Sequence, residues 1–300
     1  MRATPAGAPA SRLPIAGSPS EMDMKRIVIL TGSELRHRFV RKALALSPGI
    51  GVLRTYCEGL QNSLVDMVGK RDDSALQRAH LEARARSEED FFGAFDAFAP
   101  DRSNPVAIDR GRINDPEHAE AVIGLKPDLL VAYGCSIIRA PLLEAFQGRF
   151  LNVHLGLSPY YRGSGTNFWP LVNGEPEFVG ATFMHIDAGV DTGEVIHQMR
   201  ARIFPGDTPH QIGNRLIADM ARVYAAVIRS FDRLGRMPQI PVPQTERVYR
   251  KRDLTEEATA ALYRAFADGL VDRYLAEREA RCAAAPIVEN PAVLEALRAS

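Results

Sequence analysis

The chain has 300 residues, enough for one large domain or two smaller ones with a buried core. Apolar residues make up 46%, charged residues 25% and aromatic residues 7%, the composition of an ordinary globular protein. The 37 Lys and Arg residues balance the 37 Asp and Glu residues. The sequence therefore offers no broad positive charge for nucleic acid or for an anionic membrane, and we expect neither as a partner.

The three cysteines, Cys57, Cys135 and Cys282, lie far apart, and no C-x-x-C pair occurs. This spacing excludes a disulfide scaffold and argues against a thiolate zinc site, so we expect buried thiols in a reducing compartment. No apolar run approaches the length of a membrane helix. The sequence predicts a soluble, cytoplasmic protein.

The first 24 residues are rich in Ala, Pro, Gly and Ser and lack the apolar core of a signal peptide. We expect a disordered tail, with the folded part beginning at Lys25. The apolar run 27–30 then ends in Thr31-Gly32-Ser33, and an amphipathic stretch follows over 34–46. A strand, a glycine turn and a helix open an α/β unit.

The same alternation continues along the chain. We expect strands at 51–56, 105–108, 129–133, 150–153, 180–186 and 194–198, and helices over 62–97, 115–125 and 208–234. Strands that alternate with helices at this spacing predict an α/β fold with a mainly parallel sheet flanked by helices.

A Pro-rich connector, residues 237–244, marks a boundary between a domain over 25–235 and an extension over 236–300. A D-x-x-E capping box, Asp253 to Glu256, predicts the start of a helix there. Its apolar stripe belongs to the core and comprises Ala258, Leu262, Phe266, Leu270 and Tyr274. A last helix should open at Asn290-Pro291, which makes the extension mostly helical.

The chemistry-bearing residues lie between 151 and 198. Asn152 and His154 alternate on a strand and point to one face, which pairs a carboxamide with an imidazole. A glycine-rich loop follows, and Asp187 and Asp191 then share a turn with two glycines. Taken alone, the Asn-His pair also fits a structural hydrogen-bonded pair, and the Asp turn fits an Asx-turn or a cation loop.

Together these segments resemble one family. Asn152-Val-His154-Leu-Gly156-Leu-Ser158-Pro159-Tyr-Tyr161-Arg162-Gly163, followed by Asp187-Ala188-Gly189-Val190-Asp191-Thr-Gly193, resembles the hallmark of the folate-dependent formyltransferases. That family includes glycinamide ribonucleotide, methionyl-tRNA and sugar N-formyltransferases. The resemblance covers residues 25–235. Gly156 stands where the family usually has Ser, and Ser158 stands where Leu is usual.

The resemblance implies a Rossmann-like formyltransferase fold and transfer of a formyl group from N10-formyltetrahydrofolate to an amine, without a metal. Asn152 and His154 would donate to the tetrahedral oxyanion, and Asp191 would orient the imidazole and help relay the proton. The expected acceptor-binding residues are Tyr161, Arg162 and Gly163. The expected folate-binding residues are Tyr133, Gly134, Cys135, Ser136, Ile137, Ile138, Asp187, Ala188, Gly189 and Val190.

The sequence after the formyltransferase motifs favours one class of acceptor within the family. Methionyl-tRNA formyltransferases carry a C-terminal β-barrel, which the helical pattern after Met237 does not predict. Formyltetrahydrofolate hydrolases carry an N-terminal regulatory domain, which the first 24 residues do not predict. A glycinamide ribonucleotide enzyme would leave residues 236–300 unexplained. A small-molecule amine, with a nucleotide-linked amino sugar as the favoured class, is the expected acceptor, and a homodimer is compatible with the sequence.

Two functions outside the family fit the sequence less well. A Ser–His–Asp hydrolase would need a G-x-S-x-G elbow, and Gly156-Leu-Ser158-Pro-Tyr lacks its final glycine. A non-catalytic folate- or nucleotide-binding protein on the same fold should have lost one of Asn152, His154 and Asp191, and all three are present.

Overall fold

The computed structural model describes residues 24–60, 74–187, 189, 193–242 and 247–299. The expectations for the N-terminal tail and for Ala188, Val190 and Asp191 therefore fall on residues outside the described ones, apart from Met24 at the end of the tail.

The described chain folds around a seven-stranded sheet with the order β3-β2-β1-β4-β5-β7-β8. Its strands are β1 (Lys25–Gly32), β2 (Ile50–Glu58), β3 (Pro105–Ile108), β4 (Leu129–Tyr133), β5 (Phe150–Leu155), β7 (Gly180–His185) and β8 (Val195–Arg200). The first five strands pair in parallel, and β7 and β8 are antiparallel to their neighbours. Because β2 and β4 flank β1 on opposite sides, a ligand crevice is expected at the carboxyl ends of β1 and β4.

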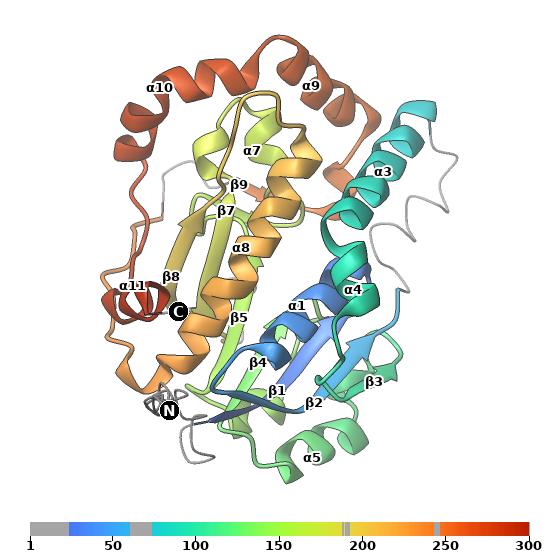
Figure 1. Ribbon diagram of the computed structural model, residues 1–300, viewed down its shortest axis with the longest axis vertical. Helices are drawn as coiled ribbons and strands as arrows, with labels where there is room; N and C mark the ends of the chain where they lie inside the picture. Colours follow the sequence, from blue (N-terminus) through green and yellow to red (C-terminus); the bar gives the residue numbers. More distant parts are fainter. Residues whose placement is uncertain (1–23, 61–73, 188, 190–192, 243–246, 300) are drawn as a thin grey trace, which may run out of the picture.

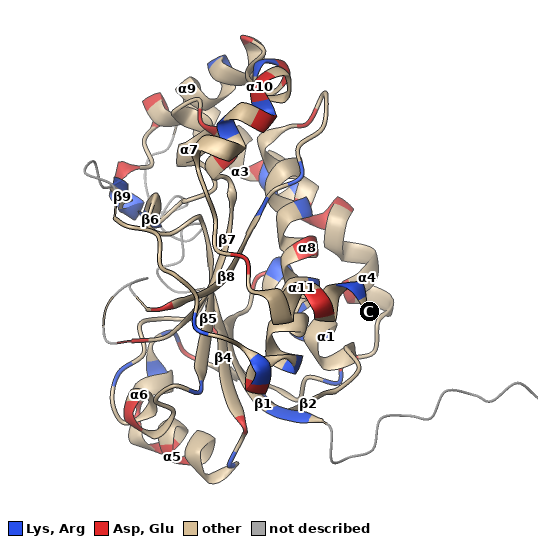
Figure 2. Ribbon diagram, turned by 90° about the vertical axis from the view of Figure 1, so that its left-hand side faces the viewer, with Lys and Arg blue, Asp and Glu red and all other residues tan. Residues whose placement is uncertain are grey.

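Helices cover both faces of the sheet (Figures 1 and 2). One face carries α1 (Leu35–Leu46), α8 (Pro209–Arg229) and α11 (Pro291–Arg298), with α3 (Ala75–Glu88) and α4 (Ala94–Phe98) beside them. A short π-helix over Glu89–Gly93 joins α3 to α4. The other face carries α5 (Pro116–Gly124) and α6 (Leu142–Ala145). The predicted α/β fold with a mainly parallel sheet is confirmed.

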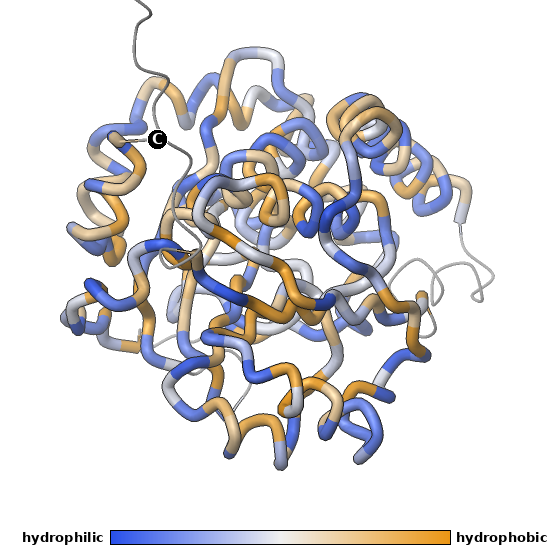
Figure 3. The backbone as a smooth tube through the Cα atoms, turned by 60° about the horizontal axis from the view of Figure 1, so that its bottom comes forward, coloured by the Kyte–Doolittle hydropathy of each residue, from blue (hydrophilic) through white to orange (hydrophobic). Residues whose placement is uncertain are grey.

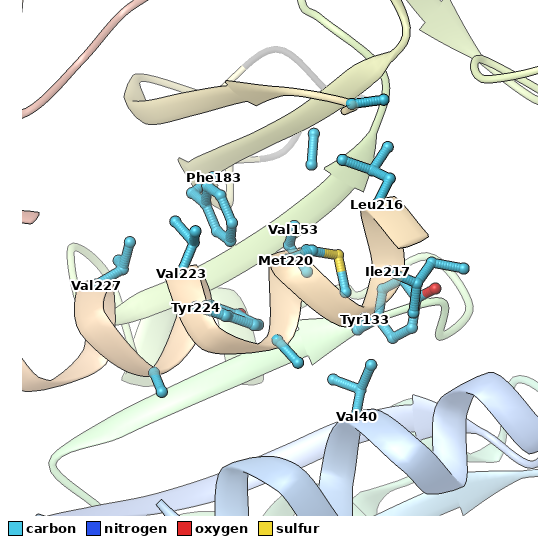
Figure 4. Packing of buried hydrophobic residues seen from close by; sticks show 14 of the residues in the cluster. Val40, Tyr133, Val153, Phe183, Leu216, Ile217, Met220, Val223, Tyr224 and Val227 are labelled. Atoms are coloured by element: carbon cyan, nitrogen blue, oxygen red, sulfur yellow. The ribbon is translucent and has the colours of Figure 1, made fainter. Parts of the chain in front are cut away.

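Helix α8 forms the centre of the larger core. It starts with a capping box in which Thr208 and Gln211 bond each other's backbone N–H groups, and its apolar face packs on the sheet. Figure 4 shows Val223 of this helix beside Phe183 of β7, with Met220 close to Val153 of β5. Hydrophobic segments cross the middle of the molecule (Figure 3). Among the described helices, none combines the length and the apolar character needed to cross a bilayer.

A two-stranded sheet that the sequence did not predict joins the extension to the loop after β5. Strand β6 (Tyr161–Gly163) pairs in parallel with β9 (Arg247–Tyr249). Gly163 has a φ of 89°, and a Cβ there would collide with the carbonyl oxygen of Tyr249. The close pairing therefore requires glycine at this position, and it holds the region after the connector against the site.

The C-terminal helices differ from the expectation in two ways. The single predicted helix is two helices, α9 (Glu256–Ala267) and α10 (Leu270–Ala284), because Gly269 adopts a φ of 78° and breaks the chain direction. The predicted cap Asp253 is wrong: Thr255 caps α9, and Asp253 instead accepts from the Arg250 N–H at 2.6 Å in the preceding turn. Helix α11 does begin at Pro291, with Asn290 as its cap.

The cysteine expectation also needs correction. Cys57, Cys135 and Cys282 are free thiols, and each is half-buried instead of fully buried. Burial raises the pKa of the Cys135 thiol to about 12, so it is a neutral group at physiological pH.

Candidate active site

A cavity of about 560 Å³ opens at the carboxyl ends of β4 and β5. Small-molecule sites commonly have volumes of several hundred Å³. The loop after β4, the end of β5, the turn after β7 and the first turns of α8 all contribute to its walls. Arg36 and His37, which follow β1, also line the cavity, so it reaches the crevice that the strand order predicts between β1 and β4.

Asn152 and His154, to which the sequence analysis gave catalytic roles, both line this cavity. They lie on β5, where Asn152 pairs with Met184 and His154 with Thr182 of β7. Tyr224 of α8 also holds this strand. Its buried hydroxyl accepts from the Ala132 N–H at 3.2 Å and donates to the Leu151 carbonyl at 3.1 Å. Strand β5 is thus held by backbone pairing with β4 and β7 along its two edges and by the buried hydroxyl of Tyr224.

Thr166 supplies a contact to the imidazole that the sequence did not reveal. Its Oγ1 lies 3.2 Å from His154 Nε2 and also bonds the Leu155 carbonyl oxygen. Since the carbonyl can only accept, the hydroxyl donates to it, and its oxygen then accepts from an Nε2–H of His154. This geometry favours the Nε2–H tautomer of the neutral ring.

Gly156 is explained by the same threonine. A Cβ at Gly156 would stand 2.6 Å from the Thr166 Cβ and 2.9 Å from His154 Nε2, closer than real contacts allow. Its φ of 154° also favours glycine. With Thr166 and His154 in these positions, a serine at position 156 would therefore collide with both side chains.

The predicted folate-binding residues gather on two loops that face the cavity. Tyr133, Gly134, Cys135, Ser136, Ile137 and Ile138 line it from one side, and Asp187 and Gly189 line it from the turn after β7. Ile137 is 64% exposed, which leaves an apolar side chain at the mouth for a planar ring. In the turn, Asp187 Oδ1 accepts from the Gly189 N–H at 2.9 Å.

Glu58 anchors the first of these loops. Its buried carboxylate accepts from the Ser136 N–H and Oγ–H, both at 2.6 Å, and from the Gly111 N–H at 3.0 Å. Three donors on one carboxylate make a strong, directional anchor. The conformation of the Ser136 loop therefore depends on a residue at the end of β2.

The three predicted acceptor-binding residues lie in different surroundings. Gly163 lines the cavity, whereas Tyr161 and Arg162 are not among its lining residues. Tyr161 is fully buried, and its hydroxyl bonds Glu175, Asn173 and Arg247. Arg162 lies beside it on β6 and is half-buried. Their assignment to acceptor binding stays a prediction.

Helices α3, α8 and α9 form a wall that sequence reasoning missed. His80 of α3 and His210 of α8 line the cavity with ring centres 4.7 Å apart, and His80 Nδ1 lies 3.1 Å from the Tyr263 hydroxyl of α9. Burial lowers the pKa of each histidine to about 4, so both rings are neutral at physiological pH. No motif marks these residues, because three distant segments meet here.

His37, on the first turn of α1, was also missed. It is 6% exposed and packs between Gly32 and Gly134, where a Cβ on either glycine would collide with the imidazole. Burial and the charges of Arg36, Arg84 and Arg110 hold its pKa well below the usual range. Its Nδ1 has no hydrogen-bond partner among the described residues.

The described residues contain no group of three His, Cys, Asp or Glu side chains placed to hold a metal ion. Asp191 is outside the part of the chain that the structure describes, so its proposed role rests on the motif alone. The described donors around Asn152 are amide, imidazole, hydroxyl and backbone groups.

Fold and site together define an α/β protein with a cavity at the switch point of a mainly parallel sheet, the place where such folds commonly bind small ligands. A family model described as formyl transferase matches residues 60–228, more than half of the chain. The chain therefore belongs to the formyl transferase family, which confirms the resemblance seen in its motifs.

Curated relatives include two enzymes described as methionyl-tRNA formyltransferase. The one from Desulforamulus reducens is 38% identical over 127 residues, which are 41% of this chain and 39% of the relative. The one from Burkholderia vietnamiensis is 32% identical over 161 residues, 52% of this chain and 49% of the relative. The chain thus spans less than half the length of these relatives.

A solved structure with the same fold is that of a sugar N-formyltransferase from Shewanella sp. FDAARGOS_354. It aligns with a TM-score of 0.51 at 14% identity and covers 81% of this chain and 88% of that one. At this identity the similarity concerns the fold.

Proposed function

We propose that the protein transfers a formyl group from N10-formyltetrahydrofolate to the amine of a small molecule. The observation that carries the proposal is the placement of Asn152 and His154 side by side on β5, at the wall of the cavity, in a chain of the formyl transferase family. The two loops that contain Ser136 and Asp187 face that pair, and the cavity between them suits the pterin end of the cosubstrate.

In this reaction the amine lone pair attacks the formyl carbon and forms the new C–N bond. The carbonyl electron pair moves to oxygen, and N10 then leaves with the electrons of the broken C–N bond while it takes up the proton that the amine loses. Asn152 would donate a hydrogen bond to the oxyanion from its amide, where preorganised donors act most strongly. His154 would donate as the imidazolium, because the single N–H of the neutral ring already faces Thr166. Asp191 would orient the imidazole and help to pass the proton.

For the acceptor, a nucleotide-linked amino sugar remains the favoured class. In the described part of the extension, one short strand is followed by three helices, which differs from the β-barrel that the resemblance associates with tRNA substrates. Methionyl-tRNA is the second candidate, because the curated relatives bear that name. The division into a catalytic domain over 25–235 and an extension over 236–300 stays a prediction.

The test is a transfer assay on the full chain with 10-formyltetrahydrofolate and three acceptors: a nucleotide-linked amino sugar, glycinamide ribonucleotide and methionyl-tRNA. Release of tetrahydrofolate is followed by absorbance. Formylation of the amino sugar alone is the expected result. Turnover with methionyl-tRNA alone would establish the second candidate, and failure to bind 5-formyl or 10-formyl folates at millimolar concentration would overturn the family activity for this chain.

A further inference from the structure

The extension reaches the loop after the catalytic strand through β9, and Figure 2 shows β9 beside β6 of that loop. In this pair Arg247 lies opposite Tyr161, and Tyr249 lies opposite Gly163. The Tyr249 carbonyl oxygen also accepts from the Ser164 N–H at 2.8 Å. The main chain of the extension therefore fixes the backbone of the loop at Ser164.

The side chain of Tyr249 binds a second part of the same region. Its ring is stacked on the indole of Trp169, the first residue of α7 (Trp169–Val172), with ring centres 4.2 Å apart and ring planes inclined by 7°. Asn173, which follows α7, donates to the Tyr249 hydroxyl from Nδ2 at 2.9 Å. A stacked pair and a hydrogen bond at this distance hold a side chain in one orientation. Tyr249 thus joins β9 to both ends of α7.

Arg247 attaches the other end of β9. Its Nη1 donates to the Tyr161 hydroxyl at 2.6 Å, and its guanidinium forms an ion pair with Glu175. The Tyr161 hydroxyl in turn donates to Glu175 and accepts from Asn173 Nδ2 at 2.9 Å. Because Tyr161 is fully buried, this network anchors β9 to the interior of the protein.

Tyr249 therefore contacts both ends of the segment 164–169. Its carbonyl binds Ser164 at the beginning, and its ring packs on Trp169 at the end. Within the segment, the Gly165 carbonyl accepts from the Trp169 N–H at 3.1 Å. Thr166 lies between these two fixed points, is 3% exposed and lines the catalytic cavity. The position of Thr166 thus depends on a residue of the extension.

Thr166 passes this position on to the catalytic strand. Its Oγ1 lies 3.2 Å from His154 Nε2 and donates to the Leu155 carbonyl oxygen. A displacement of Thr166 by about 1 Å would break the contact with the imidazole, because a separation beyond roughly 3.5 Å is no longer a hydrogen bond. The orientation of the His154 ring is therefore sensitive to the way the segment 164–169 is held.

We propose that Tyr249 of the extension is a positioning residue for formyl transfer: it holds the segment 164–169, keeps Thr166 on His154 and so orients the imidazole towards the oxyanion. This inference rests on the proposed formyl transfer and goes beyond it, because it gives the extension a part in the chemical step. Among the described residues, Tyr249 is not one of those that line the catalytic cavity. Its loss should therefore affect kcat more than ligand affinity.

The experiment compares the full-length wild type with Tyr249→Ala, Tyr249→Phe and Val248→Ala. Trp169 is the only tryptophan of the chain, so its fluorescence reports on the stacked pair. In Tyr249→Ala the emission should move to longer wavelength, because water reaches the uncovered face of the indole. Tyr249→Phe keeps the stacked ring and should keep the wild-type emission.

Steady-state kinetics on the same proteins tests the effect on the chemical step. Tyr249→Ala should lower kcat about tenfold, while the acceptor KM and the folate Kd change by less than about twofold. Tyr249→Phe should recover most of the rate. Val248→Ala is the matched control, since Val248 is the neighbouring residue of β9 and is 49% exposed, and it should match the wild type in emission and in kcat.

A double variant separates positioning from a general loss of structure. Tyr249→Ala and Thr166→Val break the same contact with His154, so the two changes together should lower kcat about tenfold, no more than either alone. Independent effects would multiply to about 100-fold and would overturn the proposal. Thermal melts check folding. If Tyr249→Ala does not fold, Arg247→Met takes its place, since it removes the polar anchor of β9 and keeps the stacked pair. A kcat loss in Arg247→Met that adds nothing to that of Thr166→Val supports the proposal, and a wild-type kcat overturns it.

The remaining outcomes distinguish this proposal from the formyl transfer itself. A shifted emission with unchanged kcat in Tyr249→Ala would show that the stacked pair does not act on His154. An equal loss in kcat and in folate or acceptor affinity would assign Tyr249 to binding. Both results overturn the proposal and leave formyl transfer intact. A wild type that binds no folate and formylates no amine would instead reject formyl transfer and this inference with it.

Discussion

The Oγ1 of Thr166 lies 3.2 Å from Nε2 of His154 and is itself fixed by the Leu155 carbonyl. The threonine sits twelve residues beyond the histidine, on the far side of the glycine-rich loop. It thereby couples the conformation of that loop to the orientation of the proposed catalytic imidazole.

Thr166→Val should lower kcat about tenfold while changing the acceptor KM and the folate Kd little, because valine keeps the shape but removes the acceptor oxygen. Thr166→Ser retains the hydroxyl and should recover most of the rate. Steady-state kinetics on both variants provides the measurement. If valine and serine lowered kcat equally, the threonine would act through packing alone.

Replacement of Asn152 or His154 by alanine addresses the chemical step itself. Each change should depress kcat on the order of 100- to 1000-fold, because the lost donors act mainly on the oxyanion. The Kd of 5-formyltetrahydrofolate should change far less, as expected for contacts that strengthen in the transition state. Equal losses in kcat and in folate affinity would mean that both side chains only hold the substrate.

Much of the fold follows from local sequence signals. The apolar run 129–133 coincides with β4, and the Asn290-Pro291 pair opens α11, since a buried strand and a capped helix both have short-range signatures. The β6–β9 pairing could not be predicted in this way, because two three-residue strands lack periodicity and meet only in the folded chain. The break at Gly269 was hidden by an apolar stripe that continues through it.

In the candidate site, too, some residues could be predicted from the sequence and others could not. Asn152 and His154 are neighbours in sequence and carry a family motif, so they could be predicted from the chain. Glu58 and Ser136 lie 78 residues apart and meet only because β2 and β4 both flank β1. Such anchoring residues carry no sequence signature, since their role depends on a contact between distant segments.

Glu58→Gln tests that anchor. Glutamine replaces one acceptor oxygen by a donor, which would face the N–H or O–H groups of Ser136 or Gly111 and leave buried polar groups unsatisfied. We expect a loss of about 1–3 kcal/mol in the free energy of unfolding. The folate Kd should also rise about tenfold. Without the charge-assisted hydrogen bonds to Glu58, the Ser136 loop is no longer held in the conformation that faces the folate.

Ser136→Ala is the matched control for this change, as it removes a single O–H donor and keeps the backbone N–H bond to Glu58. Urea unfolding and folate titration should show a clearly smaller effect for Ser136→Ala. Equal folate affinity in the wild type and Glu58→Gln would show that the Ser136 loop keeps its shape without the carboxylate.

The last prediction concerns acid stability and the attachment of α11. His197 of β8 is 2% exposed, and its Nδ1 accepts from the Asn290 N–H at 3.0 Å, so the folded state needs the neutral ring. Burial lowers the pKa of His197 to about 4, below the usual 6.5. Between these pH values the unfolded chain binds a proton that the folded chain does not. The neutral His197 ring therefore contributes fully to the free energy of unfolding above pH 6.5. On acidification towards pH 4 this contribution is lost, which lowers the free energy of unfolding by about 3 kcal/mol.

His197→Asn should flatten the pH dependence of the free energy of unfolding between pH 6.5 and 4, because the asparagine oxygen can accept the Asn290 N–H without titrating. Urea unfolding at several pH values provides the measurement, and the difference between wild type and variant removes the contributions of His80 and His210, which have the same sign. The hydrogen-exchange protection factors of the α11 amides, which are corrected for the intrinsic pH dependence of exchange, should fall on acidification in the wild type more than in the variant, since protonation of His197 opposes the Asn290 N–H that fixes the start of this helix. Identical pH profiles for the two proteins would show that the Asn290 contact does not depend on the charge of His197.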